Sequence, residues 1–385
     1  MGKIRVIHHT NDLGLGGTEK TMQLFCKYLD KSVFDVHAMA PKSPVSPFKM
    51  RINSIKAVLG NERARERKLR YELNNCRAPD MANLLGEDHL HLYATKQLAE
   101  VISGVSPHIL HVHHSGEIEA PLDNLQAIAN VPLIFTTNIF GIQGRKPEQE
   151  RISKILFVSK WLKDVEAAWS QNDPRCDVLY NPVEKPGTDS NLRFELEIPE
   201  HMFVLGRVGR NADDIHDPIS LKAYKEIENA NTLFLVLSPP PRMIREAQEL
   251  GIRNIRFLPP STDDRYLSSY YNTIDVLAHA RHDGETFGCV IAEAMIHGKP
   301  VITHHSHIRN SQSELVDADC GFVVEQHDSS AYANCISTLM TNVNLRREMG
   351  EAARMKALKQ FEASVVTKKL ERFYVDVLRQ RGVNF

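Results

Sequence analysis

The sequence lacks the features that mark membrane-spanning, disulfide-stabilised and nucleic-acid-binding proteins. No apolar run approaches the roughly 20 residues that cross a bilayer, and the apolar stretch after Lys3 is too short for a signal peptide. The six cysteines form no CxxC pair, and several stand among apolar residues, which is typical of reduced, buried thiols. The net charge of -1 gives no reason to expect nucleic acid as a partner. We therefore expect a cytoplasmic protein that meets a membrane only from its surface.

Basic residues gather in residues 49–70, where Glu62 and Glu66 are the only acidic residues. Such a run can bind lipid headgroups, phosphate or another anionic acceptor. A solvated helix is the simpler interpretation, and the charge pattern favours it. Peripheral membrane contact through residues 49–70 is kept as a hypothesis.

Strands and helices alternate through most of the 385 residues, which predicts an α/β protein. A chain of this length with 42% hydrophobic residues is expected to form two domains. A turn-rich segment at 184–191 separates two such series of strands and helices. We predict two Rossmann-like parallel-sheet domains that face each other across a cleft, at 1–183 and 184–364, with a last helix at 365–385.

Glycines follow the first expected strand, and Gly16 and Gly17 stand where a helix should begin. They let the backbone approach a phosphate, and amides at a helix start can point at it. They match neither G-x-G-x-x-G nor the P-loop, so a simple turn is the alternative. Farther along, His111 and His113 share one face of an expected strand. We expect them in a pocket or in packing rather than on a metal, because no third ligand stands at a convincing spacing.

The most informative stretch runs from Gly284 to Thr303 and predicts a loop, a helix and a strand. Its helix is apolar nearly all round except for Glu293, so it should be buried. A buried carboxylate costs several kcal/mol, by rough estimate, unless hydrogen bonds or a cation satisfy it. A second carboxylate, Glu285, lies in the loop before the helix.

A nucleoside diphosphate sugar matches the order of these groups. The amides of Phe287 and Gly288 at the helix start would hold the diphosphate. Glu293 would accept from the ribose hydroxyls, and Glu285 would accept from hydroxyls of the sugar. Arg210, at the end of a neighbouring strand, would neutralise charge on the leaving diphosphate.

These residues resemble the donor-site signature of retaining glycosyltransferases with the GT-B fold, most of all glycosyltransferase family 4, the glycosyl transferases group 1. Glu285 and Glu293 form an E-x7-E motif, continued by Gly298-Lys299-Pro300-Val301. Four other segments agree with the family in order, namely Gly16-Gly17-Thr18-Glu19, Ser159 with Trp161, Asn181-Pro182-Val183 and Gly209-Arg210.

The resemblance implies transfer of a hexose, with retained anomeric configuration, from a nucleotide-diphosphate sugar to a hydroxyl of a glycan, lipid-linked or small-molecule acceptor. UDP or GDP is the expected carrier, and neither a metal nor another cofactor is expected to be required. The resemblance also implies that the last helix crosses back to the N-terminal domain. Glu285, Arg210, Asn138 and His113 are the expected catalytic residues. The expected donor-binding residues are Gly16, Gly17, His216, Leu258, Pro259, Thr286, Phe287, Gly288 and Glu293.

The chain departs from the family pattern at three positions. The usual lysine five or six residues after the arginine of Gly209-Arg210 is replaced by Ile215 and His216. A frequent histidine appears as Asn138, and the usual glycine after the first glutamate is Thr286. A non-catalytic nucleotide-sugar-binding protein or partner subunit with a degenerate donor site is therefore the alternative function.

Two other enzyme classes fit the sequence less well. A glycoside hydrolase needs two carboxyls facing each other across the bond, whereas Glu285 and Glu293 are separated along a helix. A nicotinamide oxidoreductase needs a glycine fingerprint that the first strand lacks. The DxD-like Asp317-Ala318-Asp319 precedes an expected turn and is assigned to structure.

Overall fold

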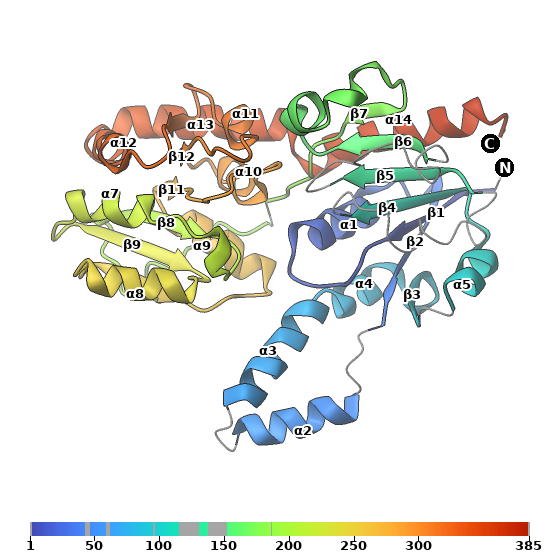
Figure 1. The fold of residues 1–385 in the computed structure, drawn as a ribbon, viewed down its shortest axis with the longest axis horizontal. Helices are drawn as coiled ribbons and strands as arrows, with labels where there is room; N and C mark the ends of the chain where they lie inside the picture. Colours follow the sequence, from blue (N-terminus) through green and yellow to red (C-terminus); the bar gives the residue numbers. More distant parts are fainter. Residues whose placement is uncertain are drawn as a thin grey trace. The chain divides into compact units, whose positions relative to one another are not determined.

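The computed structural model describes residues 2–42, 47–58, 62–94, 97–114, 131–137, 152–185 and 187–383, and it divides into two compact units (Figure 1). Unit 1 contains Met1–Val158, Leu162–Pro182 and Val366–Phe385. Unit 2 contains Ser159–Trp161 and Val183–Val365. Each unit carries its own parallel sheet, so the predicted α/β class with two parallel-sheet domains is confirmed.

The sheet of unit 1 has seven strands in the order β3-β2-β1-β4-β5-β6-β7, all paired in parallel. The strands are β1 (Ile4–His9), β2 (Phe34–Pro41), β3 (Leu90–Tyr93), β4 (Ile109–His114), β5 (Leu133–Thr137), β6 (Ile152–Phe157) and β7 (Cys176–Val178). The helices are α1 (Gly17–Tyr28), α2 (Pro47–Val58), α3 (Glu62–Asn75), α4 (Ala78–Leu85), α5 (Leu98–Val105) and α14 (Ala363–Gln380), with shorter turns η1 (Glu87–His89), η3 (Leu162–Glu166) and η4 (Ala168–Asn172).

The C-terminal helix α14 helps to build the core of unit 1. Its apolar side chains recur at helical spacing, and Val366, Leu370, Tyr374 and Val377 are buried in one cluster with residues of β1, β2 and α1. The end of the chain therefore belongs to the unit that its beginning forms, as the sequence comparison with the GT-B family predicts.

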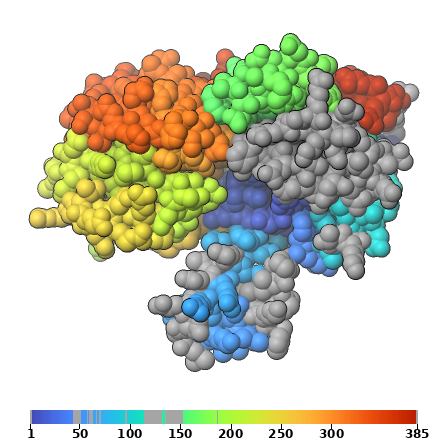
Figure 2. All heavy atoms as spheres, in the orientation of Figure 1, coloured from blue at the N-terminus to red at the C-terminus, as the bar shows by residue number. Residues whose placement is uncertain are grey.

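The basic stretch lies on α2 and α3, which pack against each other as a hairpin projecting from the sheet of unit 1 (Figures 1 and 2). On α2 the apolar Ile55 and Val58 are 62% and 84% exposed. Arg63, Arg65 and Arg67 on α3 are exposed as well. Among the described residues, no helix is both long enough and apolar enough to cross a membrane.

The sheet of unit 2 has six strands in the order β10-β9-β8-β11-β12-β13, also all parallel. The strands are β8 (Phe203–Val208), β9 (Thr232–Leu237), β10 (Ile255–Leu258), β11 (Val276–Ala278), β12 (Val301–His304) and β13 (Gly321–Val324). The helices are α7 (Ile219–Ile227), α8 (Pro241–Glu249), α9 (Asp264–Thr273), α10 (Cys289–Ile296), α11 (Gln312–Leu315), α12 (Ser329–Thr341) and α13 (Val343–Gln360), with the turn η5 (Asp213–Ile215).

The first strand of unit 2, β8, is flanked in the sheet by β9 and β11. Gly206 of β8 faces Ile274, and a Cβ there would lie 2.5 Å from that side chain. β8 and β11 are neighbours in the sheet, whereas β9 separates β10 from β8. The loops that follow β8, β10 and β11 lie at the carboxyl edge of the sheet, where parallel α/β sheets place their ligands. The sequence-predicted residues Arg210, Pro259 and Glu285 lie in these three loops.

Candidate functional site

Two glycines fix the loop that carries Glu285. Gly284 has φ +66°, and a Cβ at this position would lie 1.8 Å from the carbonyl oxygen of Arg309. Gly288 has φ +100° and caps the start of α10, where its carbonyl accepts from the amides of Ile291 and Ala292. Both conformations favour glycine, so the turn between β11 and α10 depends on these two residues.

The other two residues predicted at this helix start face different surroundings. The ring of Phe287 is 1% exposed and packs edge-on against Phe361 of unit 2, with ring centroids 5.5 Å apart. A ligand would therefore meet the backbone of Phe287 rather than its ring. Thr286 is half-buried beside it.

Glu293 is buried in α10, and Tyr271 of α9 is its hydrogen-bond partner. The hydroxyl of Tyr271 donates to Oε2 of Glu293 at 2.9 Å, and Glu293 is 8% exposed. Burial, together with the neighbouring Glu293 carboxylate, raises the pKa of Tyr271 well above its usual value, so the hydroxyl stays a neutral donor. The ring of Tyr271 also stacks on His297, at a centroid distance of 5.0 Å. From the sequence, the ribose of a sugar donor was the expected partner of Glu293, and Tyr271 was not identified.

Glu285 lies between a histidine and an arginine of the same loop region. Its Oε1 is 3.1 Å from Nε2 of His279, and its Oε2 is 3.7 Å from Nη1 of Arg281. Burial raises the pKa of Glu285, but the charge of Arg281 and the hydrogen bond from His279 outweigh burial and hold it below its usual value. Because an ionised carboxylate only accepts, Nε2 of His279 donates to Glu285, and Nδ1 of His279 is hydrogen-bonded to the hydroxyl of Thr303, 2.8 Å away.

Arg281 connects this carboxylate to a wider ion-pair network. Its guanidinium bonds both oxygens of Asp283, at 2.6 and 3.0 Å, and Asp283 also accepts from Arg309 at 2.8 Å. The amide of Glu285 donates to the side chain of Gln312. Glu285 is thus held as an anion in a fixed position, which suits a group that must accept from a sugar hydroxyl.

Arg210 was the expected cation of the site, and the structure adds a second arginine nearby, Arg207. Arg210 follows β8 and is exposed, and within the described part of the chain its guanidinium makes no ion pair. Arg207, three residues earlier, is only 4% exposed, and its Nη1 has no hydrogen-bond partner among the described residues. Burial lowers the pKa of Arg207 to about 10, and the positive charge of Arg281 acts in the same direction.

His216 was expected to take over part of the role of the missing lysine. Its side chain points into the protein interior. Its side chain is fully buried, and its Nε2 lies 2.7 Å from Oε2 of Glu246 on α8. Burial lowers the pKa of His216 below its usual value, although Glu246 acts in the opposite direction. The ring is therefore a neutral, hydrogen-bonded group. At the end of β10, Leu258 is buried and Pro259 is exposed.

The predicted residues of unit 1 lie near the carboxyl ends of its strands. Gly16 caps α1 after β1, and Gly17 is the first residue of that helix. His113 lies on β4 and is 1% exposed. Its Nε2 is 2.9 Å from Nδ1 of His8, so it belongs to a buried histidine cluster. Asn138 lies outside the described residues.

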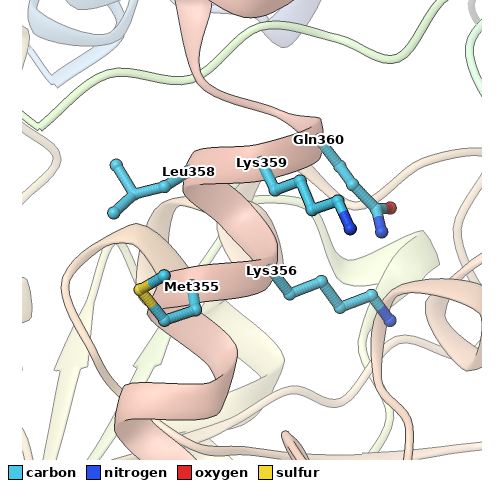
Figure 3. A pocket seen from close by; sticks show the side chains of 5 residues that line it. All are labelled: Met355, Lys356, Leu358, Lys359 and Gln360. Carbon is cyan, nitrogen blue, oxygen red and sulfur yellow. The ribbon is translucent and has the colours of Figure 1, made fainter.

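A hollow on the surface of unit 2 lies apart from these residues. A depression of about 560 Å³ runs along the end of α13, and Figure 3 shows Lys356 and Lys359 extending from the same side of that helix. The ammonium of Lys356 is already hydrogen-bonded to the carbonyl of Leu315 and to Asp317. The five residues that line the hollow all come from α13 and none from the glutamate loop, so the hollow is not the candidate site.

Sequence reasoning missed four residues of unit 2, namely Arg207, Tyr271, His279 and Arg281. Arg207 was detectable as a lone charge within the apolar strand β8, by the same argument that singled out Glu293. Arg281 was detectable too, because it precedes Glu285 by four residues.

Comparison with known proteins finds a family model that matches part of the chain. Residues 189–356 match the family model described as glycosyl transferases group 1. The chain is 28% identical over 224 residues to D-inositol 3-phosphate glycosyltransferase of Corynebacterium glutamicum (strain R), covering 55% of this chain and 52% of the relative. It is 26% identical over 199 residues to the capsular polysaccharide biosynthesis glycosyltransferase CapM of Staphylococcus aureus, covering 46% and 47%. The chain thus spans about half the length of these curated relatives.

Solved structures resemble the chain over nearly its whole length. A glycosyltransferase from Rickettsia africae matches with a TM-score of 0.73 at 17% identity, covering 98% of this chain and all of that one. Anabaena Alr3699/HepE, solved in complex with UDP-glucose, matches with a TM-score of 0.71 at 16% identity, covering 97% and 100%. At these sequence identities the structural likeness shows only the fold. The family model adds a match over residues 189–356, which lie in unit 2. The chain therefore has the fold of the GT-B glycosyltransferases, and its residues 189–356 match the glycosyl transferases group 1 model.

Proposed function

We propose that this protein is a retaining glycosyltransferase that moves a hexose from a nucleotide-diphosphate sugar to a hydroxyl of a glycan, lipid-linked or small-molecule acceptor, without an obligatory metal. The observation that carries the proposal is the pair of carboxylates on one loop and helix, each held by a different partner. Arg281 and His279 hold Glu285, and Tyr271 holds Glu293. The printed names of the relatives, which are glycosyltransferases, support the same class.

Each residue has a separate task in this proposal. Glu293 accepts from the ribose hydroxyls of the donor, and the amides of Phe287 and Gly288 receive the diphosphate at the start of α10. Glu285 accepts from hydroxyls of the transferred sugar. Leu258 and Pro259 lie near the base, and Gly16 and Gly17 contribute backbone to the phosphates.

Arginines at the end of β8 neutralise the charge that develops on the leaving diphosphate. Arg210 is exposed and unpaired within the described residues, so its charge is available to a phosphate. Arg207 supports it from a buried position. In a retaining transfer the acceptor hydroxyl attacks from the face that the diphosphate leaves, and the diphosphate accepts the proton of that hydroxyl. Asn138 is assigned to the sugar side of the site, and His113, which is 1% exposed and bonded to His8, is assigned a positioning role there.

Peripheral contact with an anionic surface is assigned to the α2–α3 hairpin. The exposed apolar Ile55 and Val58 stand on the same hairpin as the exposed arginines of α3. This combination is typical of segments that bind at a membrane interface.

Nucleotide titration of variants tests the site. We expect Glu293→Gln to weaken the binding of the matching nucleoside diphosphate by about 10- to 150-fold, the equivalent of hydrogen bonds to a charged acceptor. We expect Glu285→Gln to bind the nucleotide normally and to lose transfer. Glu348→Gln, an exposed glutamate of α13, is the matched control and should change neither measurement.

The carrier is identified first, by thermal-shift screening against UDP, GDP and ADP and their sugars, because a ligand of the native state raises the melting temperature. Unchanged nucleotide affinity in both glutamate variants would remove the motif from the site. Nucleotide-sugar binding with neither transfer nor hydrolysis would favour the alternative of a non-catalytic binding protein, which the buried His216 in place of a lysine keeps open.

A further inference from the structure

A second cluster of titratable side chains lies in unit 1, away from the residues proposed for transfer. Strand β2 alternates, with Phe34, Val36 and Ala38 in the apolar core and Asp35 and His37 on the opposite face. Strand β3 is the neighbour of β2 at the end of the seven-stranded order, and the turn η1 precedes it with His89. The pairing of Met39 with His91 brings β3 beside this face.

The ligand atoms in this cluster are close enough together to surround one metal ion. Oδ1 of Asp35 lies 3.0 Å from Nε2 of His89, and Oδ2 of Asp35 lies 3.5 Å from Nε2 of His37. The three ligand atoms all lie within 4.8 Å of one another. For zinc–ligand bonds of about 2.0–2.1 Å, two ligands of a tetrahedral site lie roughly 3.3–3.4 Å apart.

The side chain of His37 gives an independent reason to expect a cation. His37 is 8% exposed, and its buried Nε2 has no hydrogen-bond partner among the described residues. Its Nδ1 lies 3.1 Å from Nε2 of His91. When Nδ1 donates to His91, the lone pair of Nε2 points toward the Asp35 carboxylate, and two electron-rich groups face each other. A metal ion between them satisfies both.

We propose that Asp35, His37 and His89 bind one divalent ion of the zinc type, with water in the remaining coordination position. Two imidazoles and one carboxylate are a donor set that such ions prefer. His91 is a positioning residue, because it fixes the tautomer and orientation of the His37 ring through Nδ1. The side chains of Asp35 and His89 are 34% and 38% exposed, which gives the ion a path from solvent.

The location separates this site from glycosyl transfer. Asp35 and His37 are the second and fourth residues of the eight in β2, in its amino-terminal half. In unit 1 the residues proposed for transfer lie toward the opposite ends of the strands, at Gly16 after β1 and at His113 on β4. The ion would instead join β2 to the turn that leads into β3, the terminal strand of the sheet.

The buried cluster of His8, His111 and His113 also brings three ring nitrogens within 4.8 Å of one another, yet it is the weaker candidate. Nδ1 of His8 bonds His113, and the hydroxyl of Tyr374 lies 3.3 Å from Nε2 of His8 and 2.7 Å from Nδ1 of His111. The three histidines are at most 1% exposed. A metal there would have to enter the core and break these bonds, whereas at the partly exposed Asp35 it would replace one hydrogen bond, between His89 and Asp35 at 3.0 Å.

Metal titration of the full chain tests the proposal. After treatment with a chelator, the protein is titrated with Co²⁺ as a visible probe and then with Zn²⁺ in competition. We expect one ion per chain and the visible absorption of tetrahedral Co²⁺. Because the chain has 18 histidines, variants must locate the ion. His89→Ala and Asp35→Asn should each lower the affinity at least tenfold, while the exposed His201→Ala of unit 2 should leave it unchanged.

Two further measurements separate binding from folding. Zn²⁺ should raise the melting temperature of the wild type but not of His89→Ala, and without metal the two should melt alike. His91→Gln keeps an acceptor for His37 Nδ1 and should retain binding better than His91→Leu. Absence of stoichiometric binding, or binding unchanged in His89→Ala and Asp35→Asn, overturns the proposal. Loss of the ion in His8→Asn with retention in His89→Ala places it in the buried cluster and overturns the proposal equally.

Discussion

The hydrogen bond between Tyr271 and Glu293 predicts a large and specific loss of stability in Tyr271→Phe. The substitution removes only the hydroxyl, which donates to Oε2 of Glu293 at 2.9 Å. The ring of Tyr271 is 0% exposed and keeps its stacking on His297. The change therefore removes one donor that Glu293 shares with the carbonyl oxygen of Val290, at 2.9 and 3.3 Å.

The size of the loss follows from the charge of the acceptor. A hydrogen bond to a charged group contributes about 1.5–3 kcal/mol, and the carboxylate that loses its donor cannot recover it from water at 8% exposure. For a unit of this size, 1 kcal/mol corresponds to about 2–4 °C in melting temperature. We expect the transition of unit 2 to fall by about 3–12 °C.

A double-mutant cycle with Glu293→Met measures the interaction itself, because methionine has a similar volume and no acceptor. Calorimetry of the wild type, the two single variants and the double variant gives the coupling free energy. We expect the double variant to be more stable than the sum of the single losses predicts, by about 1.5 kcal/mol or more. A coupling free energy below about 0.5 kcal/mol would show that Tyr271 does not satisfy Glu293.

Two other predictions concern the loop before α10. Arg281→Gln should raise the pKa of Glu285, because burial then acts with less opposition from positive charge. The ionised form of Glu285 is present above its depressed pKa and is lost as the pH falls, so the acidic limb of the pH profile of kcat/KM should move to higher pH; an unmoved limb would contradict the pairing. Gly284→Ala should destabilise unit 2 by more than Gly251→Ala. Both glycines have positive φ, +66° and +62°, and incur about 1–2 kcal/mol of backbone strain, but only the Cβ at 284 meets a carbonyl oxygen, at 1.8 Å. Equal losses in melting temperature would show that the contact with Arg309 is absent.

The sequence predicted the elements of the fold because their patterns are local. The helical spacing of Val366, Leu370 and Tyr374 is enough to predict an amphipathic helix, and these residues are buried in the core of unit 1. The apolar surroundings of Glu293 are enough to predict a buried helix, and α10 is buried from Ile291 to Ile296. Neither pattern shows which other helix or strand the predicted helix packs against.

Partners of the site residues that come from other elements could not be predicted. Tyr271 precedes Glu293 by 22 residues and reaches it only through the packing of α9 on α10. His37 and His91 are 54 residues apart and meet through the pairing of β2 with β3. The sequence directed attention to His111 and His113 because their spacing is visible in the chain, whereas the third member of that cluster, His8, lies on β1.

The distribution of charges in unit 2 determines where a diphosphate can be neutralised. Arg281 is engaged by Asp283 and Glu285, Arg309 is engaged by Asp283, and His216 is a neutral ring bonded to Glu246. The two arginines can neutralise a phosphate only if they release a carboxylate, and the neutral His216 has no positive charge to offer. Among the described residues that follow or end β8, Arg207 and Arg210 make no ion pair. A buried guanidinium without a counterion is costly unless a ligand supplies the negative charge. In the proposed function, the replacement of the family's lysine therefore leaves the phosphate charge to two arginines three residues apart, one buried and one exposed.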